Sequence, residues 1–97
     1  MVEHLVALRL KPETSRADAD ALLAAIRGLP AQVPGILELQ CGWNISPARA
    51  RGFELGVRVR FPGRAELAAY GPHPAHAVVS ARIQQLCAEV LVLDLDP

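Results

Sequence analysis

Residues 53–61 read Phe53-Glu54-Leu55-Gly56-Val57-Arg58-Val59-Arg60-Phe61, and this stretch decides the fold. Large apolar residues occupy every second position, and glutamate, glycine and arginine fill the positions between them. Side chains of a β-strand point to opposite faces in turn, so this alternation predicts a strand with one apolar face. We therefore expect a sheet that packs one face on a core and presents a face of different character on the other side.

Three other segments are expected to be strands. Residues 2–10 alternate in the same way, and His4 falls within the apolar row of that strand. That row reads Val2, His4, Val6, Leu8 and Leu10. The other row reads Glu3, Leu5, Ala7 and Arg9. A further strand is expected over residues 36–44, after Pro34-Gly35, and the last one over residues 90–96.

Apolar residues at helical spacing predict helices between these strands. The first helix begins near Ser15, a capping residue, and Gly28 and Pro30 end it. A short helix is expected over residues 64–70, and a longer one from Pro74 to about Ala88. The order β-α-β-β-α-β, with the second helix in two pieces, predicts an α+β fold of the ferredoxin-like class. Its antiparallel sheet would carry both helices on one face, and residues 1–97 would form a single domain.

Composition and charge exclude several classes of function. Ten basic and ten acidic residues cancel, so the chain lacks the charge of a protein that binds nucleic acid or an anionic membrane. No run has the length of a membrane span, and the N-terminus lacks the basic start of a signal peptide. Cys41 and Cys87 stand far apart and outside any metal-ligand spacing, so we interpret them as reduced thiols of a cytoplasmic protein.

The sheet face away from the helices is expected to carry Leu5, Ala7 and Gly56 among charged residues. A half-apolar open face of this kind indicates a partner. A second copy that packs sheet against sheet would close it with two-fold symmetry. The sequence therefore predicts a homodimer through the open sheet face.

The candidate site is built around Tyr70-Gly71-Pro72-His73-Pro74-Ala75-His76, which holds the only tyrosine and two of the three histidines. Proline suits the first position of a helix, so His73 would cap that helix and His76 would lie in its first turn. His76 would then share the core side with His4. Two imidazoles and a phenol beside an apolar hollow could perform general acid–base chemistry on a hydrophobic substrate. The residues expected to line this hollow include Phe53, Leu55, Val57 and His73.

Structural roles for the same residues stay open. Capping explains the position of His73 fully, and His4 could simply bond to the backbone. Tyr70 could close the rim of the hollow with its hydroxyl in water. Zinc is not favoured, because no carboxylate or cysteine stands at ligand spacing from His73 and His76. We therefore expect no metal ion at this pair.

Four segments resemble the stress-responsive α/β-barrel domain family. They are VEHLVALRLKP with His4, Gly52-Phe53 at the start of the third strand, YGPHPAH, and the closing VLVLDLDP. The resemblance covers nearly the whole chain, and it implies a dimeric α/β barrel made of two ferredoxin-like protomers. Many members of the family have no assigned reaction and are named for their induction under stress.

The resemblance extends distantly to one plant member, olivetolic acid cyclase, which closes a linear polyketide by an aldol step. Carried over by position, it implies site roles for His4, Tyr70 and His76. Its third-strand histidine falls on Leu55, and its first-helix tyrosine falls on about Ile26, so both positions line a more apolar pocket in this chain. Some plant relatives also bind magnesium through main-chain carbonyls. The implied counterparts are Leu29, Gln32 and Gly35.

Two functions therefore remain open. The first is a cofactor-free cyclase or lyase for a hydrophobic, polyketide-like carbonyl compound, with His76 as the base and Tyr70 and His4 orienting the substrate. The second is a non-catalytic dimer that binds a small ligand or protects the cell under stress. No cofactor is expected for either function.

Overall fold

The computed structural model describes all 97 residues and has the element order that the sequence predicts. The strands are β1 (Val2–Leu10), β2 (Glu38–Trp43), β3 (Leu55–Phe61) and β4 (Cys87–Leu95). The helices are α1 (Arg16–Arg27), α2 (Arg64–Tyr70) and α3 (Pro74–Leu86), with two short 3-10 turns, η1 (Leu29–Ala31) and η2 (Pro47–Ala50). None of the helices has both the length and the apolar character needed to cross a membrane.

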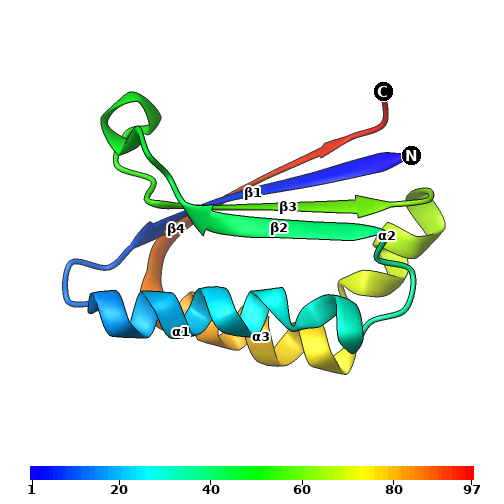
Figure 1. Ribbon diagram of the computed structural model, residues 1–97, viewed down its shortest axis with the longest axis horizontal. Coiled ribbons are helices and arrows are strands. Elements are labelled where there is room, and N and C mark those ends of the chain that lie inside the picture. Colours follow the sequence, from blue (N-terminus) through cyan, green and yellow to red (C-terminus); the bar gives the residue numbers. More distant parts are fainter.

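The four strands form one antiparallel sheet in the order β2-β3-β1-β4 (Figure 1). The central strand β1 pairs with β3 on one side and with β4 on the other. In this register His4 stands opposite Val59 of β3 and Asp94 of β4. All three helices lie on one side of the sheet, so the predicted ferredoxin-like α+β fold is confirmed.

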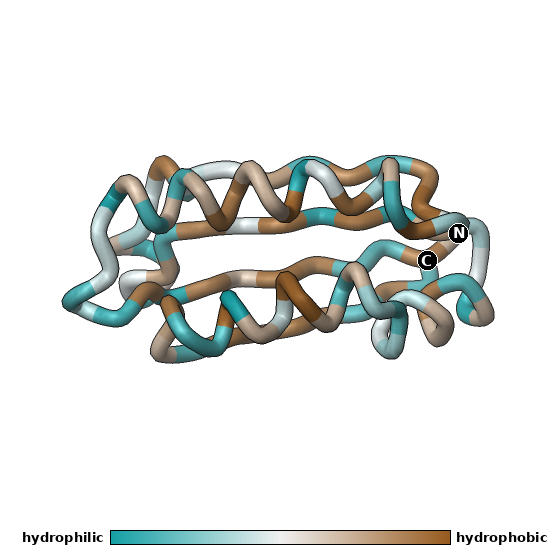
Figure 2. The backbone as a smooth tube through the Cα atoms, turned by 90° about the horizontal axis from the view of Figure 1, so that it is seen from below, coloured by the Kyte–Doolittle hydropathy of each residue, from teal (hydrophilic) through white to brown (hydrophobic).

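The core lies between the sheet and the two long helices, which run side by side along it (Figure 2). Most of its members are residues of β1 and β3 on the helix side of the sheet together with one stripe of α1, and η1, α2, α3 and β4 add single residues. The largest fully buried side chains are Leu8, Leu22, Leu23, Ile26, Leu29, Leu55, Val59 and Phe61. Burying a side chain of this size is worth about 1.5–3 kcal/mol. The burial of these side chains therefore fixes which face of each strand points toward the helices.

Side chains at the helix starts satisfy backbone donors that would otherwise lack partners. Ser15 caps α1, and its side chain accepts a hydrogen bond from the Asp18 amide at 3.1 Å. His73 caps α3, because its Nδ1 accepts from the Ala75 amide at 3.1 Å. Both capping positions agree with the sequence pattern.

The last strand begins earlier than the sequence predicts. The apolar spacing predicts a helix to about Ala88, but α3 ends at Leu86 and β4 starts at Cys87. Leu10 pairs with Cys87, and the Lys11 amide donates to the Leu86 carbonyl at 2.9 Å. Backbone pairing with β1 thus overrides the helical spacing of the apolar residues in this segment.

A buried helix residue offers the simplest test of this packing. Leu22 of α1 is 0% exposed, so Leu22→Ala should lower the free energy of unfolding by about 2–5 kcal/mol through lost burial and a residual cavity. Val78 of α3 is 65% exposed and serves as the control. Val78→Ala should change stability by no more than about 0.5 kcal/mol. If chemical denaturation showed the same loss of unfolding free energy for Leu22→Ala and Val78→Ala, the assigned core would be contradicted.

Candidate functional site

The structure brings His4, Tyr70 and His76 together on the helix side of the sheet. His4 belongs to β1, Tyr70 is the last residue of α2, and His76 lies in the first turn of α3. The ring centroid of Tyr70 lies 4.3 Å from that of His76 and 5.8 Å from that of His4. Phe61 supports the group from β3, with its ring 5.2 Å from that of Tyr70. The phenol therefore stands between the two imidazoles.

One ring nitrogen of His76 is fixed by the backbone. Its Nδ1 lies 3.0 Å from the carbonyl oxygen of Gly71, the residue that follows α2. A carbonyl oxygen can only accept, so Nδ1 must carry the proton. In the neutral imidazole Nε2 is then the proton acceptor.

His4 is held by Asp94, a residue that the sequence pattern does not single out. His4 Nδ1 and Asp94 Oδ1 are 2.5 Å apart, and the side chains are 13% and 45% exposed. The two residues face each other because β1 and β4 pair in this register. The only signal in the sequence is the acidic end of the chain, which cannot be assigned to His4 without the register. A carboxylate on Nδ1 orients the ring and leaves Nε2 as the acceptor.

Tyr70 is suited to donate a hydrogen bond. The residue is only 5% exposed, and burial raises the pKa of its phenol to about 12. Its hydroxyl makes no hydrogen bond to the protein, yet it is not sealed from solvent. Since the phenol stays protonated at neutral pH, it can stabilise a developing oxyanion but cannot serve as a base.

The remaining predicted residues lie in two places. His73 uses the lone pair of its Nδ1 in the cap of α3. Ile26 and Leu55 are 2% and 1% exposed and belong to the core between α1 and the sheet. Leu55 stands opposite Leu8, four residues along β1 from His4. The strand register thus places Leu55 toward the far end of the sheet from the histidine cluster.

The hollow adjacent to the cluster lies between α2 and β4. It has a volume of about 360 Å3, and Asp94 forms part of its wall. The other lining residues are Val2, Arg64, Leu67, Leu95 and Asp96. Arg64 donates to Asp96 at 2.8 Å, which joins the two sides of the hollow. A small molecule entering this hollow would meet the carboxylate that holds His4.

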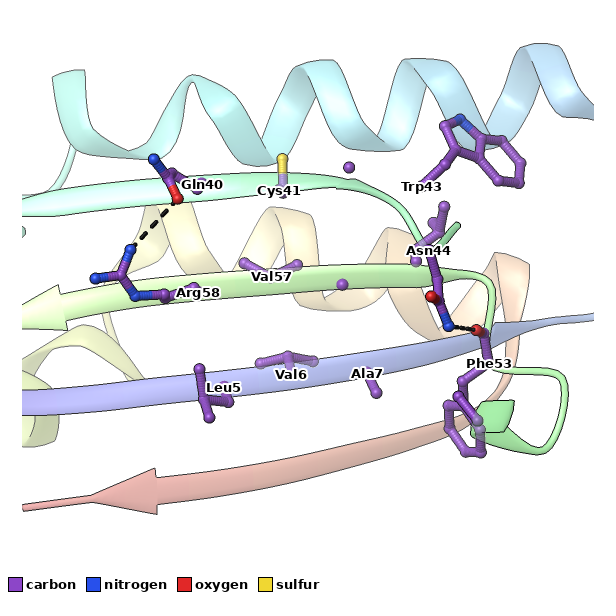
Figure 3. Close-up of a pocket in the computed structure, with 14 residues that line it drawn as sticks. Leu5, Val6, Ala7, Gln40, Cys41, Trp43, Asn44, Phe53, Val57 and Arg58 are labelled. Carbon is purple, nitrogen blue, oxygen red and sulfur yellow. Dashed lines mark hydrogen bonds between the residues drawn. The ribbon is translucent and has the colours of Figure 1, made fainter. Parts of the chain in front are cut away.

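A larger hollow of about 480 Å3 lies on the open face of the sheet (Figure 3). Residues of β1, β2 and β3 form its floor, and Arg58 and Gln40 are hydrogen-bonded to each other at 3.3 Å beside it. Phe53, Leu55 and Val57, which the sequence places around the histidines, contribute to the lining of this hollow. It is lined mainly by apolar residues and contains neither histidine nor tyrosine.

Metal-binding groups do not gather in the structure. No three histidine, cysteine, aspartate or glutamate side chains are placed to hold a metal ion. The main-chain arrangement implied for magnesium fits poorly, because the Leu29 carbonyl already accepts from the amides of Gln32 and Val33, each at 2.9 Å. Cys41 and Cys87 are free thiols whose pKa is raised, chiefly by burial, which makes them poor nucleophiles.

Comparison with known proteins identifies relatives of the whole chain. The family described as "Stress responsive A/B Barrel Domain" matches residues 2–97, which confirms the resemblance found in the sequence. A stress-response A/B barrel domain-containing protein of Arabidopsis thaliana is 34% identical over 68 residues. That match takes in 70% of this chain but only 26% of the relative, so the chain spans about a quarter of its length.

Two solved structures share the fold closely. A hydroxynitrile lyase from Passiflora edulis superposes with a TM-score of 0.88 at 25% identity, over 97% of this chain and 90% of the lyase. A dimeric ferredoxin-like protein of unknown function from Jannaschia sp. CCS1 gives a TM-score of 0.86 at 27% identity, over 99% and 98% of the two chains. The architecture is thus shared with a protein that is dimeric and with one that is a lyase.

The raised pKa of Tyr70 can be measured directly, because it is the only tyrosine. Absorbance near 295 nm should show tyrosinate forming at about pH 12 in the folded protein, and at about pH 10 once the chain is unfolded. Because the folded pKa is the higher one, the linked stabilisation is complete below about pH 10 and is lost between about pH 10 and about pH 12. Tyr70→Phe should remove that loss. A folded-state midpoint near pH 10 would contradict the burial of the phenol.

Proposed function

The chain belongs to the stress-responsive A/B barrel domain family, and we propose that it is a cofactor-free lyase or cyclase for a hydrophobic carbonyl compound. Proton transfer at the carbon next to the carbonyl is the central step. The observation that carries this proposal is the cluster of His4, Tyr70 and His76, in which both histidines have Nδ1 engaged and Nε2 left as acceptor.

His76 is the proposed base. Its Nε2 would take the proton from the substrate carbon, while the Gly71 carbonyl holds the ring in one tautomer. The imidazolium that forms stays hydrogen-bonded to that carbonyl through its Nδ1 proton. Returning this proton to a product atom would restore the neutral ring, so the cycle needs no external reagent.

Tyr70 is the proposed hydrogen-bond donor to the substrate oxygen. As negative charge moves onto that oxygen, a neutral phenol at hydrogen-bonding distance stabilises it. The pKa of about 12 prevents Tyr70 from losing its proton at neutral pH. His4, oriented by Asp94, would accept a hydrogen bond from a substrate hydroxyl group or shuttle a proton on the other side of the phenol ring.

The apolar surroundings support a hydrophobic substrate. Phe61 packs on Tyr70, and Val2, Leu67 and Leu95 line the adjacent hollow. Removing water from such a site strengthens the hydrogen bonds made to a developing charge. The Passiflora relative, a hydroxynitrile lyase, supports carbonyl chemistry on this scaffold.

We also propose that the working protein is a homodimer joined through the open face of the sheet. The Jannaschia structure is of a dimeric protein, and the open face of this chain carries several exposed leucines. Such an apolar face is costly to leave in water. The site on the helix side would remain accessible in this dimer, because the two features lie on opposite sides of the sheet.

A second candidate is a non-catalytic dimer that binds a small apolar ligand. It is favoured by the full burial of Ile26 and Leu55, which are 2% and 1% exposed and add no polar group to the helix side. In that case the cluster of His4, Tyr70 and His76 would be a structural feature, and its alanine variants would lose stability without losing a reaction.

Deuterium exchange separates the two candidates. A panel of aryl and alkyl methyl ketones in D2O, followed by NMR, reports proton removal next to the carbonyl without knowledge of the natural substrate. His76→Ala should slow the exchange catalysed by the protein about 10²–10⁴-fold. Tyr70→Phe should slow it about 10²–10³-fold, as expected for loss of an oxyanion donor.

His73→Ala is the matched control, because it removes a histidine of the same segment whose Nδ1 serves only the helix cap. It should lower stability by about 1 kcal/mol and leave the exchange rate unchanged. Exchange that is absent in the unmodified protein, or equal in the His76→Ala variant, would overturn the catalytic proposal and support the second candidate.

A further inference from the structure

The hollow between α2 and β4 continues the candidate site outward. Arg64, Leu67 and Tyr70 are spaced by three along α2, so they share one side of the helix. Tyr70 contacts the rings of His4 and His76, whereas Arg64 and Leu67 line the hollow. One side of α2 therefore leads from the phenol, past an apolar residue, to a guanidinium group.

The two strands opposite α2 repeat this order. On β1, Val2 lies two residues outward from His4, lines the hollow and is 2% exposed. On β4, Asp94 holds His4, and Asp96 follows two residues later, with both carboxylates in the wall of the hollow. The hollow thus has a reactive inner end, an apolar middle and a charged outer end. The outer end is open to solvent, since the side chain of Arg64 is 81% exposed.

The guanidinium of Arg64 is only partly used within the chain. Its Nε donates to Oδ2 of Asp96 at 2.8 Å, while its two terminal nitrogens make no hydrogen bond to the protein. A guanidinium has five N–H donors, so four of them stay free. An ion pair as exposed as this one adds little to stability. Its main consequence is that Asp96 holds the free donors of Arg64 at the outer end of the hollow.

The charges around the hollow indicate what kind of group would bind there. Arg64 brings one positive charge, and Asp94 and Asp96 bring two negative charges. A ligand carboxylate would therefore meet an excess of negative charge, and a ligand ammonium would meet the guanidinium at the outer end. An uncharged oxygen can accept a hydrogen bond from Arg64 without either repulsion.

We propose that Arg64 binds the end of the substrate that lies away from the reacting carbonyl, and that this end is an uncharged carbonyl or hydroxyl oxygen. The inference deepens the proposed lyase or cyclase and rests on it. Arg64 is then a specificity-determining residue, because it contacts a part of the substrate that does not react. Asp96 is a positioning residue that acts through Arg64.

Helix geometry sets the length of this substrate. Arg64 and Tyr70 are six residues apart, which corresponds to about 9 Å along a helix. Tyr70 is the proposed donor to the reacting carbonyl, so the second oxygen lies about 9 Å from the first. Val2, Leu67 and Leu95 would contact the apolar chain between them. The volume of about 360 Å3 falls within the range of small-ligand pockets.

Three methyl ketones of equal length test the choice of end group. Their far ends, about 9 Å from the carbonyl, are a primary amide, a methyl group and a carboxylate. In the deuterium exchange assay the amide should give a KM about tenfold below that of the methyl end, because a charged donor binds its oxygen. The carboxylate should give the highest KM. The effect belongs in KM, since the contact lies away from the reacting carbon.

Two results of this series would overturn the inference. Equal KM values for the amide and the methyl end would show that nothing binds the second oxygen, while the proposed proton transfer would stand. A lowest KM for the carboxylate end would show that the hollow selects an anion rather than an uncharged group.

Replacing Arg64 tests the contact itself. Arg64→Met removes the donors but keeps an unbranched apolar side chain, so it should abolish the preference for the amide. Arg16→Met is the matched control. Arg16 is also the first residue of its helix, its side chain is 74% exposed, and it pairs with Asp20 at 3.8 Å. This control should keep the preference. Loss of the preference in both variants, or in neither, would contradict the role of Arg64.

Replacing Asp96 tests the charge argument. Asp96→Asn removes one of the two carboxylates, so the charges of Arg64 and Asp94 would then balance. The KM of the carboxylate ketone should fall at least about threefold, because the excess negative charge is gone. An unchanged KM for this ketone would contradict the argument that the hollow excludes anions.

Calorimetry separates failure of this inference from failure of the proposed chemistry. Titration of the amide-ended ketone measures binding even where no exchange occurs. Its dissociation constant should be about tenfold higher for Arg64→Met than for the unmodified protein. Such a difference without exchange of any ketone would overturn the proposed proton transfer and leave the contact with Arg64 in place. Equal dissociation constants would overturn the inference whatever the exchange shows.

Discussion

The position of β1 between β3 and β4 is the constraint on which the rest of the structure depends. Side chains alternate along a strand, so a shift of one residue would move His4 to the open face and Glu3 into the core. The register is fixed by the apolar row that includes Leu8, which must face the helices. The pairing of β4 with β1 then places Asp94 opposite His4 on the helix side of the sheet. The orientation of β1 therefore decides both which of its residues belong to the candidate site and which lie on the open face.

The two sides of the sheet are suited to different tasks. On the helix side, polar groups are few, and both histidines of the site have a defined partner: His4 with Asp94, and His76 with the Gly71 carbonyl. Tyr70 is the exception, because its hydroxyl has no partner in the protein. On the open side, charges of both signs border bare glycines and exposed leucines. The first arrangement suits chemistry on a small molecule, and the second suits a protein surface.

Much of the fold can be predicted from the sequence because strand alternation and helix capping are local. Ser15 and His73 mark the starts of their helices, and the alternation in residues 53–61 marks a half-buried strand. The start of β4 cannot be predicted in this way, because hydrogen bonds to β1 decide it. The same limit applies to the site. Tyr70 and His76 are near in sequence and are readily grouped, whereas the contact of Asp94 with His4 depends on the strand register.

The tautomers of the three histidines test the central claim most directly. Two-bond 15N–1H correlation spectra at a pH where the rings are neutral distinguish a proton on Nδ1 from one on Nε2. The structure predicts a proton on Nδ1 for His76 and His4, with Nε2 free to accept, and the opposite tautomer for the helix cap His73. A proton on Nε2 of His76 would leave the site without its base and would contradict the proposed chemistry.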